Sequence, residues 1–212
     1  SPSSAASDVY KRQVKAFLAV EEIDMVYVGI KPDWHEYTNE LFERFGIDSR
    51  RVKVIDGGAD RNGTVMNIAE AIVAEHGENE GDIILTHDAV RPFVTEKIIK
   101  DNIEAMKEHS ACGTYMPAAD TIIRSDGEKV SETLNRSELY QAQTPQTFRL
   151  GDLRRNYYSL SEEQNKKLTD TCSVFTACNE DIYLVVGDAL NFKITTDSDL
   201  RMANALAELS EK

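Results

Sequence analysis

Apolar runs and amphipathic stretches alternate along most of the chain. Strand-like apolar runs occupy residues 25–30, 52–55, 82–86 and 112–117, and two more follow in "IYLVVG" and "NFKIT". Between them, apolar residues recur at three- and four-residue intervals, as in Val65, Ile68 and Ile72, which predicts helices with one buried face. Further helices are predicted near 150–178 and at the C-terminus. This order predicts an α/β fold of the Rossmann-like type, a mostly parallel sheet with helices on both faces.

Residues 118–148 interrupt this alternation. The stretch "DTIIRSDGEKVSETL" has two short alternating segments around Asp126-Gly127, a strong hairpin turn signal. It contains too few apolar residues to be stable as an isolated ribbon. We therefore predict that residues 119–142 form a β-arm that projects from the sheet and is covered by a second subunit in a homodimer. A solvent-exposed hairpin is the alternative.

The first 13 residues differ in pattern from the rest of the chain. Residues 1–13, "SPSSAASDVYKRQ", show no strand or helix periodicity and are predicted to be a disordered tail. They also resemble a translated sequencing adapter, in which case they are not native. Residues 14–212 contain enough apolar material for one core of ordinary size, so a single domain is expected.

Charge and composition exclude several classes of function. The formal net charge of -13 argues against broad nucleic-acid binding, which needs a basic face, so an anionic ligand must meet a local basic cluster. The three cysteines lack the spacing of a disulfide framework or a zinc site, and a reducing cytoplasm fits them best. No apolar stretch approaches the roughly 20 residues that span a bilayer, so no membrane association is expected.

The most suggestive polar residues follow the run at 82–86. In a sheet of this type, ligands bind where the loops after the strands converge. Asp88 in "THDAVRPF" is placed there to hold Mg²⁺ against phosphate oxygens, and Arg91 supplies a planar guanidinium for a second phosphate. A plain surface ion pair between the two is the alternative. Lys193 precedes the C-terminal helix, where a lone lysine is usually a solvated charge.

A second loop, "GGADRNGT", follows the run at 52–55. Gly57 and Gly58 permit positive φ and close backbone approach, and Arg61, Asn62 and Thr64 lead into a helix whose N-terminus favours a negative ligand. Such glycine turns also occur for packing reasons alone.

Five motifs together resemble one family. "GGADRNGTV", "THDAVRPF", "YQAQTPQTF", "LTDTCSVF" and "NFKITTDSDL" occur in the order and spacing found in cytidylyltransferases that act on polyol phosphates, and the resemblance covers about Val14 to the end. It implies the nucleotide-diphospho-sugar transferase type of fold. One branch of the family makes CDP-methylerythritol for isoprenoid synthesis, and the other makes CDP-ribitol for wall teichoic acid. "YQAQTPQTF", "LTDTCSVF", Ala59 and Thr64 look more like the ribitol branch.

The resemblance also implies roles for particular residues. It implies catalysis by Asp88, Arg91 and Lys193, with Mg²⁺ as cofactor held by Asp88. The implied CTP-binding residues are Gly58, Ala59, Thr64 and Asp88. The implied polyol-phosphate-binding residues are Ala89, Arg91, Thr121, Arg136, Thr144, Thr169 and Lys193. In this family the arm brings the position of Arg136 into the neighbouring subunit's site. A partner reductase is a further possibility.

One departure from the family pattern is large. The family begins with a strand and a glycine-rich loop whose Arg and Lys hold the CTP phosphates, and nothing before "VKAFLAVEEID" matches them. Without that strand, neighbouring strand edges are expected to be unpaired. We expect this chain to bind CTP poorly and to turn over little or nothing. A non-catalytic nucleotide-binding module and a fragment that only dimerises are the alternatives to an enzyme.

Overall fold

The computed structural model describes residues 4–210, and the side chains of residues 11–209. Its helices are α1 (Ser4–Leu18), α2 (His35–Arg44), α3 (Arg61–His76), α4 (Glu96–Ala105), α5 (Leu150–Ser159), α6 (Glu162–Asn165), α7 (Cys172–Ala177) and α8 (Asp197–Ser210), with short 3-10 turns η1 (Pro32–Trp34) and η2 (Arg136–Glu138). Its strands are β1 (Val26–Ile30), β2 (Val52–Asp56), β3 (Ile83–Thr86), β4 (Ala111–Pro117), β5 (Ile123–Ser125), β6 (Val130–Thr133), β7 (Tyr140–Arg149) and β8 (Tyr183–Val186).

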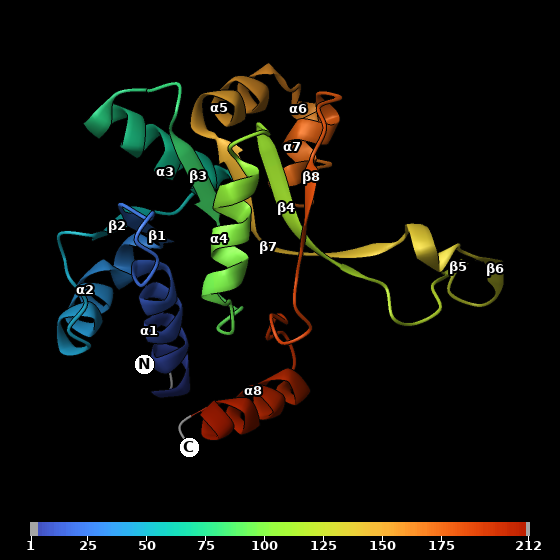
Figure 1. The fold of residues 1–212 in the computed structure, drawn as a ribbon, viewed down its shortest axis with the longest axis horizontal. Helices are drawn as coiled ribbons and strands as arrows, with labels where there is room; N and C mark the ends of the chain where they lie inside the picture. The colour runs from blue at the N-terminus through green and yellow to red at the C-terminus, as the bar shows by residue number, and fades with distance from the viewer. Residues whose placement is uncertain (1–3, 211–212) are drawn as a thin grey trace.

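The central sheet has the strand order β3-β7-β4-β8 (Figure 1). Strand β7 runs antiparallel to both β3 and β4, whereas β4 and β8 are parallel. The antiparallel β7 was not predicted, and "NFKIT" is not a strand in the structure. Strands β1 and β2 form a separate parallel pair. The α/β class is thus confirmed, with one antiparallel strand inside the central sheet.

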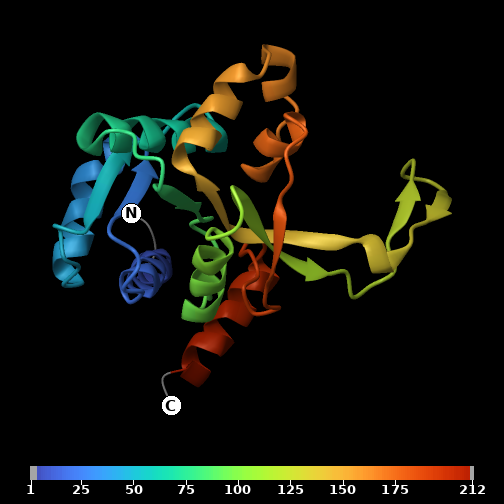
Figure 2. The same ribbon diagram turned by 45° about the horizontal axis from the view of Figure 1, so that its top comes forward.

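Helices cover both faces of the strands, as predicted. On one face, α3, α5 and α7 bury an apolar cluster that includes Met66, Phe148 and Phe175. On the other face, α1 and α4 bury a second cluster around Val20 and Ile99. Figure 2 shows the two layers, with α3 and α5 above the strands and α1 and α4 below. None of the described helices is long and apolar enough to cross a membrane.

The N-terminal region differs from expectation. Residues 4–18 form one helix, whereas residues 1–13 were predicted to be a disordered tail; residues 1–3 lie outside the described part of the chain. Gln13, Val14 and Phe17 of this helix are buried. The burial of one helical face against the strands and α4 supplies a stabilisation that the weak local pattern did not reveal.

The predicted β-arm is present. Strands β5 and β6 pair around a turn in which Gly127 has a φ of 102°. Every residue of both strands is exposed, and the hairpin projects from the body of the molecule (Figure 1). Its cover by a second subunit stays a prediction.

One edge of β1 and one edge of β3 are unpaired in the described residues, as expected. β1 pairs only with β2, and β3 pairs only with β7. Their free edges line a common groove.

Candidate active site

Three cations surround the carboxylate of Asp88 just beyond the carboxyl end of β3. Arg61 Nε lies 3.0 Å from Oδ1, while Arg91 Nε and Lys193 Nζ each lie 3.4 Å from Oδ2. The structure therefore brings together the three residues predicted to be catalytic, from segments more than 100 residues apart in sequence. The excess of positive charge at this point is the local basic cluster that an anionic ligand of an acidic protein requires.

Burial and charge act against each other at Asp88. Its side chain is 13% exposed. Burial raises the pKa of a carboxyl group, but the positive charges of Arg61, Lys193 and Arg91 outweigh burial and lower the pKa of Asp88 below its ordinary value. Asp88 is therefore an anion at neutral pH, able to bind cations.

Arg91 is held by the main chain around it. Its side chain is 10% exposed, and its Nη1 and Nη2 donate to the carbonyl oxygens of Asn191 and Ala142 at 2.8 and 3.3 Å. Burial lowers the pKa of Arg91, and the charge of Asp88 opposes this. Because each nitrogen of the guanidinium already has a protein partner, only its remaining N–H groups are available to a phosphate.

Lys193 is the most accessible cation of the cluster. Its side chain is 46% exposed, compared with 34% for Arg61. It lies in an extended segment without strand pairing, which is fastened where Ile194 N–H donates to the carbonyl of Val90 at 2.9 Å. Of the three cations, Lys193 is therefore the one with the most surface open to a ligand.

Polar contacts fix the backbone at the end of β3. The N–H of Asp88 donates to Thr144 Oγ1 at 3.0 Å, and that hydroxyl also lies 2.9 Å from His87 Nδ1. Burial lowers the pKa of His87 to about 4, although its contact with the Arg91 carbonyl opposes the shift. His87 is therefore neutral at pH 7 and orients the loop. Gln13 of α1 donates to the Asp88 carbonyl at 2.9 Å.

The glycine loop after β2 forms the opposite side of the site. The N–H of Gly58 donates to Thr64 Oγ1 at 2.9 Å, and Asp60 caps α3 by accepting from the N–H of Gly63. A Cβ at Gly58 would lie 2.4 Å from the carbonyl carbon of Gly63, so close approach requires glycine here. Positive φ is not the reason, because neither Gly57 nor Gly58 adopts it. Ala59 is exposed in this loop.

Arg61 was named in the glycine loop from the sequence but was given no role among the site residues. Besides Asp88, it contacts Thr171 Oγ1 through Nη1 at 2.6 Å. It thereby links the glycine loop, the end of β3 and the loop before α7. The available signal was its position, five residues after β2 at the edge of the sheet where Asp88 also lies.

The remaining predicted residues fall into two groups. Ala89 adjoins Asp88 and lines the same groove, and Thr169 lies with Arg61 along a second cavity of about 540 Å³. Thr121 and Arg136 are exposed on the arm, and Arg136 donates to the carbonyl of Ala119 at 2.8 Å. No hydrogen bond or ion pair among the described residues joins them to the Asp88 cluster.

Asp88 is compatible with Mg²⁺ in one way only. The described residues contain no group of three or more His, Cys, Asp or Glu side chains that could hold a metal ion. Both carboxylate oxygens of Asp88 already face cations. Mg²⁺ commonly binds one or two carboxylates and completes its shell with water and substrate phosphates. The site therefore fits a metal that arrives with a polyphosphate.

Comparison with known proteins identifies the family. The family model described as IspD, 2-C-methyl-D-erythritol 4-phosphate cytidylyltransferase, matches residues 5–208. The chain belongs to this family. Its activity class is therefore cytidylyl transfer, and the predicted family and fold are confirmed.

Relatives within the cytidylyltransferase family differ in the acceptor that their names state. A ribitol-5-phosphate cytidylyltransferase of Lactiplantibacillus plantarum is 42% identical over 195 residues, which are 92% of this chain and 83% of that protein. Among solved structures, 4-diphosphocytidyl-2C-methyl-D-erythritol synthase from Anaerococcus prevotii has a TM-score of 0.82 at 28% identity, covering 94% of this chain and 86% of its own. The IspD of Francisella tularensis has a TM-score of 0.77 at 29% identity, covering 92% and 86%.

Proposed function

We propose that this cytidylyltransferase moves CMP from CTP to D-ribitol 5-phosphate, giving CDP-ribitol and pyrophosphate. The observation that supports it is the cluster of Arg61, Arg91 and Lys193 around Asp88, within a family of cytidylyltransferases. The choice of ribitol rests on the 42% identical relative that bears that name, and on the resemblance of Ala59 and Thr64 to the ribitol branch. CDP-ribitol of this kind would supply polymers such as wall teichoic acid.

The reaction needs charge stabilisation more than covalent chemistry. A phosphate oxygen of ribitol 5-phosphate bonds to the α-phosphorus of CTP, and the bond from that phosphorus to the bridging oxygen of pyrophosphate breaks. Negative charge accumulates on the five-coordinate phosphorus, so fixed cations lower the barrier by positioning and electrostatics. The accessible Lys193 is suited to the phosphoryl oxygens. Arg91, anchored to two carbonyls, is suited to hold Asp88 and the acceptor phosphate in place.

The glycine loop is suited to the nucleotide. Gly58 brings the main chain against the first turn of α3, and the helix N-terminus there favours a negative ligand. In this proposal Mg²⁺ is held by Asp88 and by the CTP phosphates, and it neutralises phosphate charge during transfer.

The arm extends the proposal to assembly. Its exposed strands leave Ile123 and Val130 in solvent at 44% and 63% exposure, and a second copy of the chain would cover such side chains. The homodimer would bring Thr121 and Arg136 to the partner's site. Light scattering on the intact chain and on a variant with Val130→Ser tests it, because a dimer through the arm should dissociate more readily in the variant. A cytoplasmic location and a partner reductase complete the proposal.

A side-by-side acceptor experiment tests the function. The chain is incubated with CTP, Mg²⁺ and either ribitol 5-phosphate or methylerythritol 4-phosphate, while pyrophosphate and the CDP product are measured. Isothermal titration of each acceptor in the presence of CTP gives binding independently of turnover. We expect ribitol 5-phosphate to be preferred in both measurements. Preference for methylerythritol 4-phosphate would reassign the acceptor. Weak binding of CTP is expected, so the result that would contradict the enzymatic function is the absence of any binding, by CTP and by both acceptors.

A further inference from the structure

Two buried carboxamides adjoin the cation cluster. The side chains belong to Gln143 on β7 and to Asn191 in the loop that follows β8, and the two residues are 7% and 0% exposed. Asn191 Nδ2 donates to Gln143 Oε1 at 3.2 Å and to the carbonyl oxygen of Thr144 at 2.8 Å. Because both side chains are buried, neither is placed to touch a substrate. Any contribution that they make to the reaction must pass through other residues.

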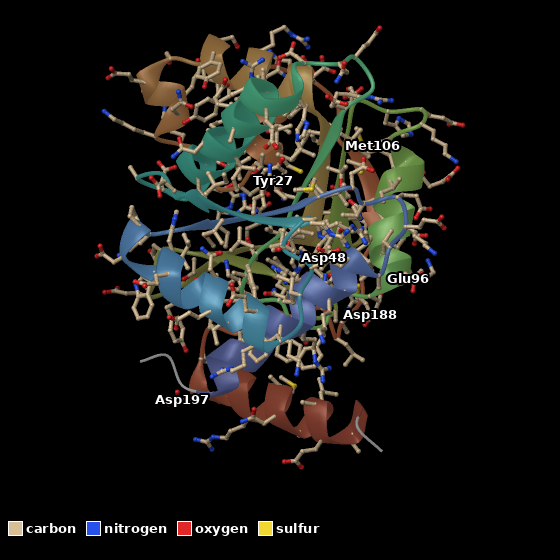
Figure 3. All side chains as sticks on the ribbon, turned by 90° about the vertical axis from the view of Figure 1, so that its left-hand side faces the viewer. Tyr27, Asp48, Glu96, Met106, Asp188 and Asp197 are labelled. Atoms are coloured by element: carbon tan, nitrogen blue, oxygen red, sulfur yellow. The ribbon has the colours of Figure 1, made fainter. Side chains whose placement is uncertain are left out.

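The two carboxamides hold the loop after β8 against the central sheet. Gln143 Nε2 donates to the carbonyl oxygen of Asp188 at 2.9 Å, and the N–H of Asp188, which is labelled in Figure 3, donates to Gln143 Oε1 at 3.3 Å. Within the loop, the N–H of Asn191 donates to the same carbonyl oxygen at 3.0 Å. A Cβ at Gly187 would lie 2.5 Å from Gln143 Oε1, so the close approach of the loop requires glycine there. The loop is therefore anchored to β7 through the side chains of Gln143 and Asn191.

The anchored loop presents its main chain to the active site. The carbonyl oxygen of Asn191 accepts a hydrogen bond from Arg91 Nη1 at 2.8 Å. Two residues later, Lys193 Nζ lies 3.4 Å from Asp88 Oδ2. A hydrogen bond with a charged donor is roughly twice as strong as one between neutral groups. The position of the Asn191 carbonyl therefore helps to determine where the guanidinium of Arg91 lies relative to Asp88.

The partners of Asn191 explain why this position suits asparagine. Both groups that face Nδ2 are acceptors, so the site requires two donor hydrogens on one short side chain, and a carboxamide supplies them. Asn191 Oδ1 is buried and has no hydrogen-bond partner in the described part of the chain. A buried oxygen without a partner is unfavourable. The two donors, and not the oxygen, are therefore what this side chain contributes.

We propose that Asn191 is a positioning residue for Arg91 and that Gln143 supports it. The carboxamide of Asn191 fixes the loop after β8, and its main-chain carbonyl then holds the guanidinium of Arg91 in the orientation that cytidylyl transfer needs. This assignment rests on the proposed function, in which Arg91 holds Asp88 and the acceptor phosphate. The orientation of Arg91 can be measured without turnover, so a failure of this inference is distinguishable from a failure of the proposed function.

The test compares Asn191→Ser with Asn102→Ser. Asn102 is the matched control, because it is also 0% exposed and its Nδ2 also donates twice, to the carbonyl oxygen of Ile98 and to Thr114 Oγ1, at 2.9 Å each. NMR of the intact chain with isotope-labelled arginine measures how fast the Arg91 guanidinium rotates about its Nε–Cζ bond. We expect Asn191→Ser to raise this rate about tenfold, because the carbonyl at residue 191 is no longer held against Nη1. Asn102→Ser should change it less than about twofold.

A second variant keeps the test decisive if Asn191→Ser does not fold. Gln143→Met roughly keeps the length of the side chain and removes the acceptor of Asn191, so it should also speed the rotation of Arg91. The rate of cytidylyl transfer should fall about tenfold further in Asn191→Ser than in Asn102→Ser, because the cation is less well positioned. Rotation as slow as in the wild type in the site variants would overturn the inference, whatever the transfer rate. Measurable transfer at equal rates in Asn191→Ser and Asn102→Ser would also overturn it, because the role of Asn191 would then be structural only.

Discussion

Replacing Asp88 by asparagine tests the electrostatic description of the site most directly. The substitution keeps the shape of the side chain and removes the charge that faces Arg61, Arg91 and Lys193. Removing one partner of a buried ion pair costs about 3–5 kcal/mol, because the other charge stays buried without compensation. Arg91 is 10% exposed, whereas water screens Arg61 and Lys193, so we expect the lower end, about 3 kcal/mol. For a chain of this size the melting temperature should fall by about 6–12 °C.

Urea unfolding followed by circular dichroism measures the loss of unfolding free energy. The dependence of that loss on pH is a second test. The pKa of Asp88 is lower in the folded chain than in the unfolded one, so its contribution is present above about pH 4 and disappears as the pH falls through the lowered folded value. The difference between wild type and Asp88→Asn should therefore shrink below pH 4. Asp48, labelled in Figure 3, is the matched control. Arg50 lowers the pKa of Asp48 to about 2, but the side chain of Asp48 is 39% exposed and that of Arg50 is 87% exposed, so water screens the pair. Asp48→Asn should change stability little, and an equal effect of the two substitutions would refute the reasoning.

Three further predictions concern single side chains. Lys193→Met should lower the rate of cytidylyl transfer by roughly 100-fold, with little change in melting temperature because the Lys193 side chain is 46% exposed. Lys129→Met in the hairpin turn is its control. Equal rates for the two variants would contradict the proposed role of Lys193. Gly58→Ala should lower the free energy of unfolding, measured in urea, by about 1–3 kcal/mol, because the new Cβ would lie 2.4 Å from the backbone of Gly63. Gly81→Ala is the control, because a Cβ there has open space. Equal effects of the two substitutions would exclude the clash. The pKa of His87 is about 4 in the folded chain, so the free energy of unfolding should decrease from pH 6.5 toward pH 4, because the imidazole of the unfolded chain takes up a proton in that range. His87→Gln should reduce this dependence of the unfolding free energy on pH. An unchanged dependence would mean that His87 titrates normally.

The strands that the sequence predicted and the strand that it missed differ in how burial is achieved. β1, β2, β3, β4 and β8 are apolar runs, and hydrophobic pattern alone located them. β7 is buried at Gln143, Thr144, Gln146 and Thr147, which are polar. Such residues are tolerated in a core only when hydrogen bonded, as Gln146 is to Asp170 Oδ2 at 2.6 Å. No local pattern reveals partners that are distant in sequence, so only the first residues of β7, up to 142, were included in the predicted arm and no strand was predicted beyond them.

The candidate site shows the same division. The position of Asp88 after an apolar strand, with Arg91 three residues later, indicated the site from the local sequence. Arg61 could not be assigned in that way, because its contact with Asp88 depends on how far a long side chain reaches between two loops. Lys193 could be assigned to the site only from the fold, in which the hydrogen bond from Ile194 to the carbonyl of Val90 holds its segment beside Asp88.

β7 also connects the arm to the active-site rim. It begins at the exposed Tyr140, the carbonyl of Ala142 accepts from Arg91, and the hydroxyl of Thr144 accepts from the N–H of Asp88. At 3.3 Å per residue, only about 13 Å of extended chain separates the exposed Tyr140 from Thr144, which contacts Asp88. A partner subunit that fixes the arm would thus restrain the carbonyl that orients Arg91, in addition to any side chain that it contributes. The arm therefore lies close enough to the rim, through one continuous strand, for assembly to influence the geometry of the cation cluster.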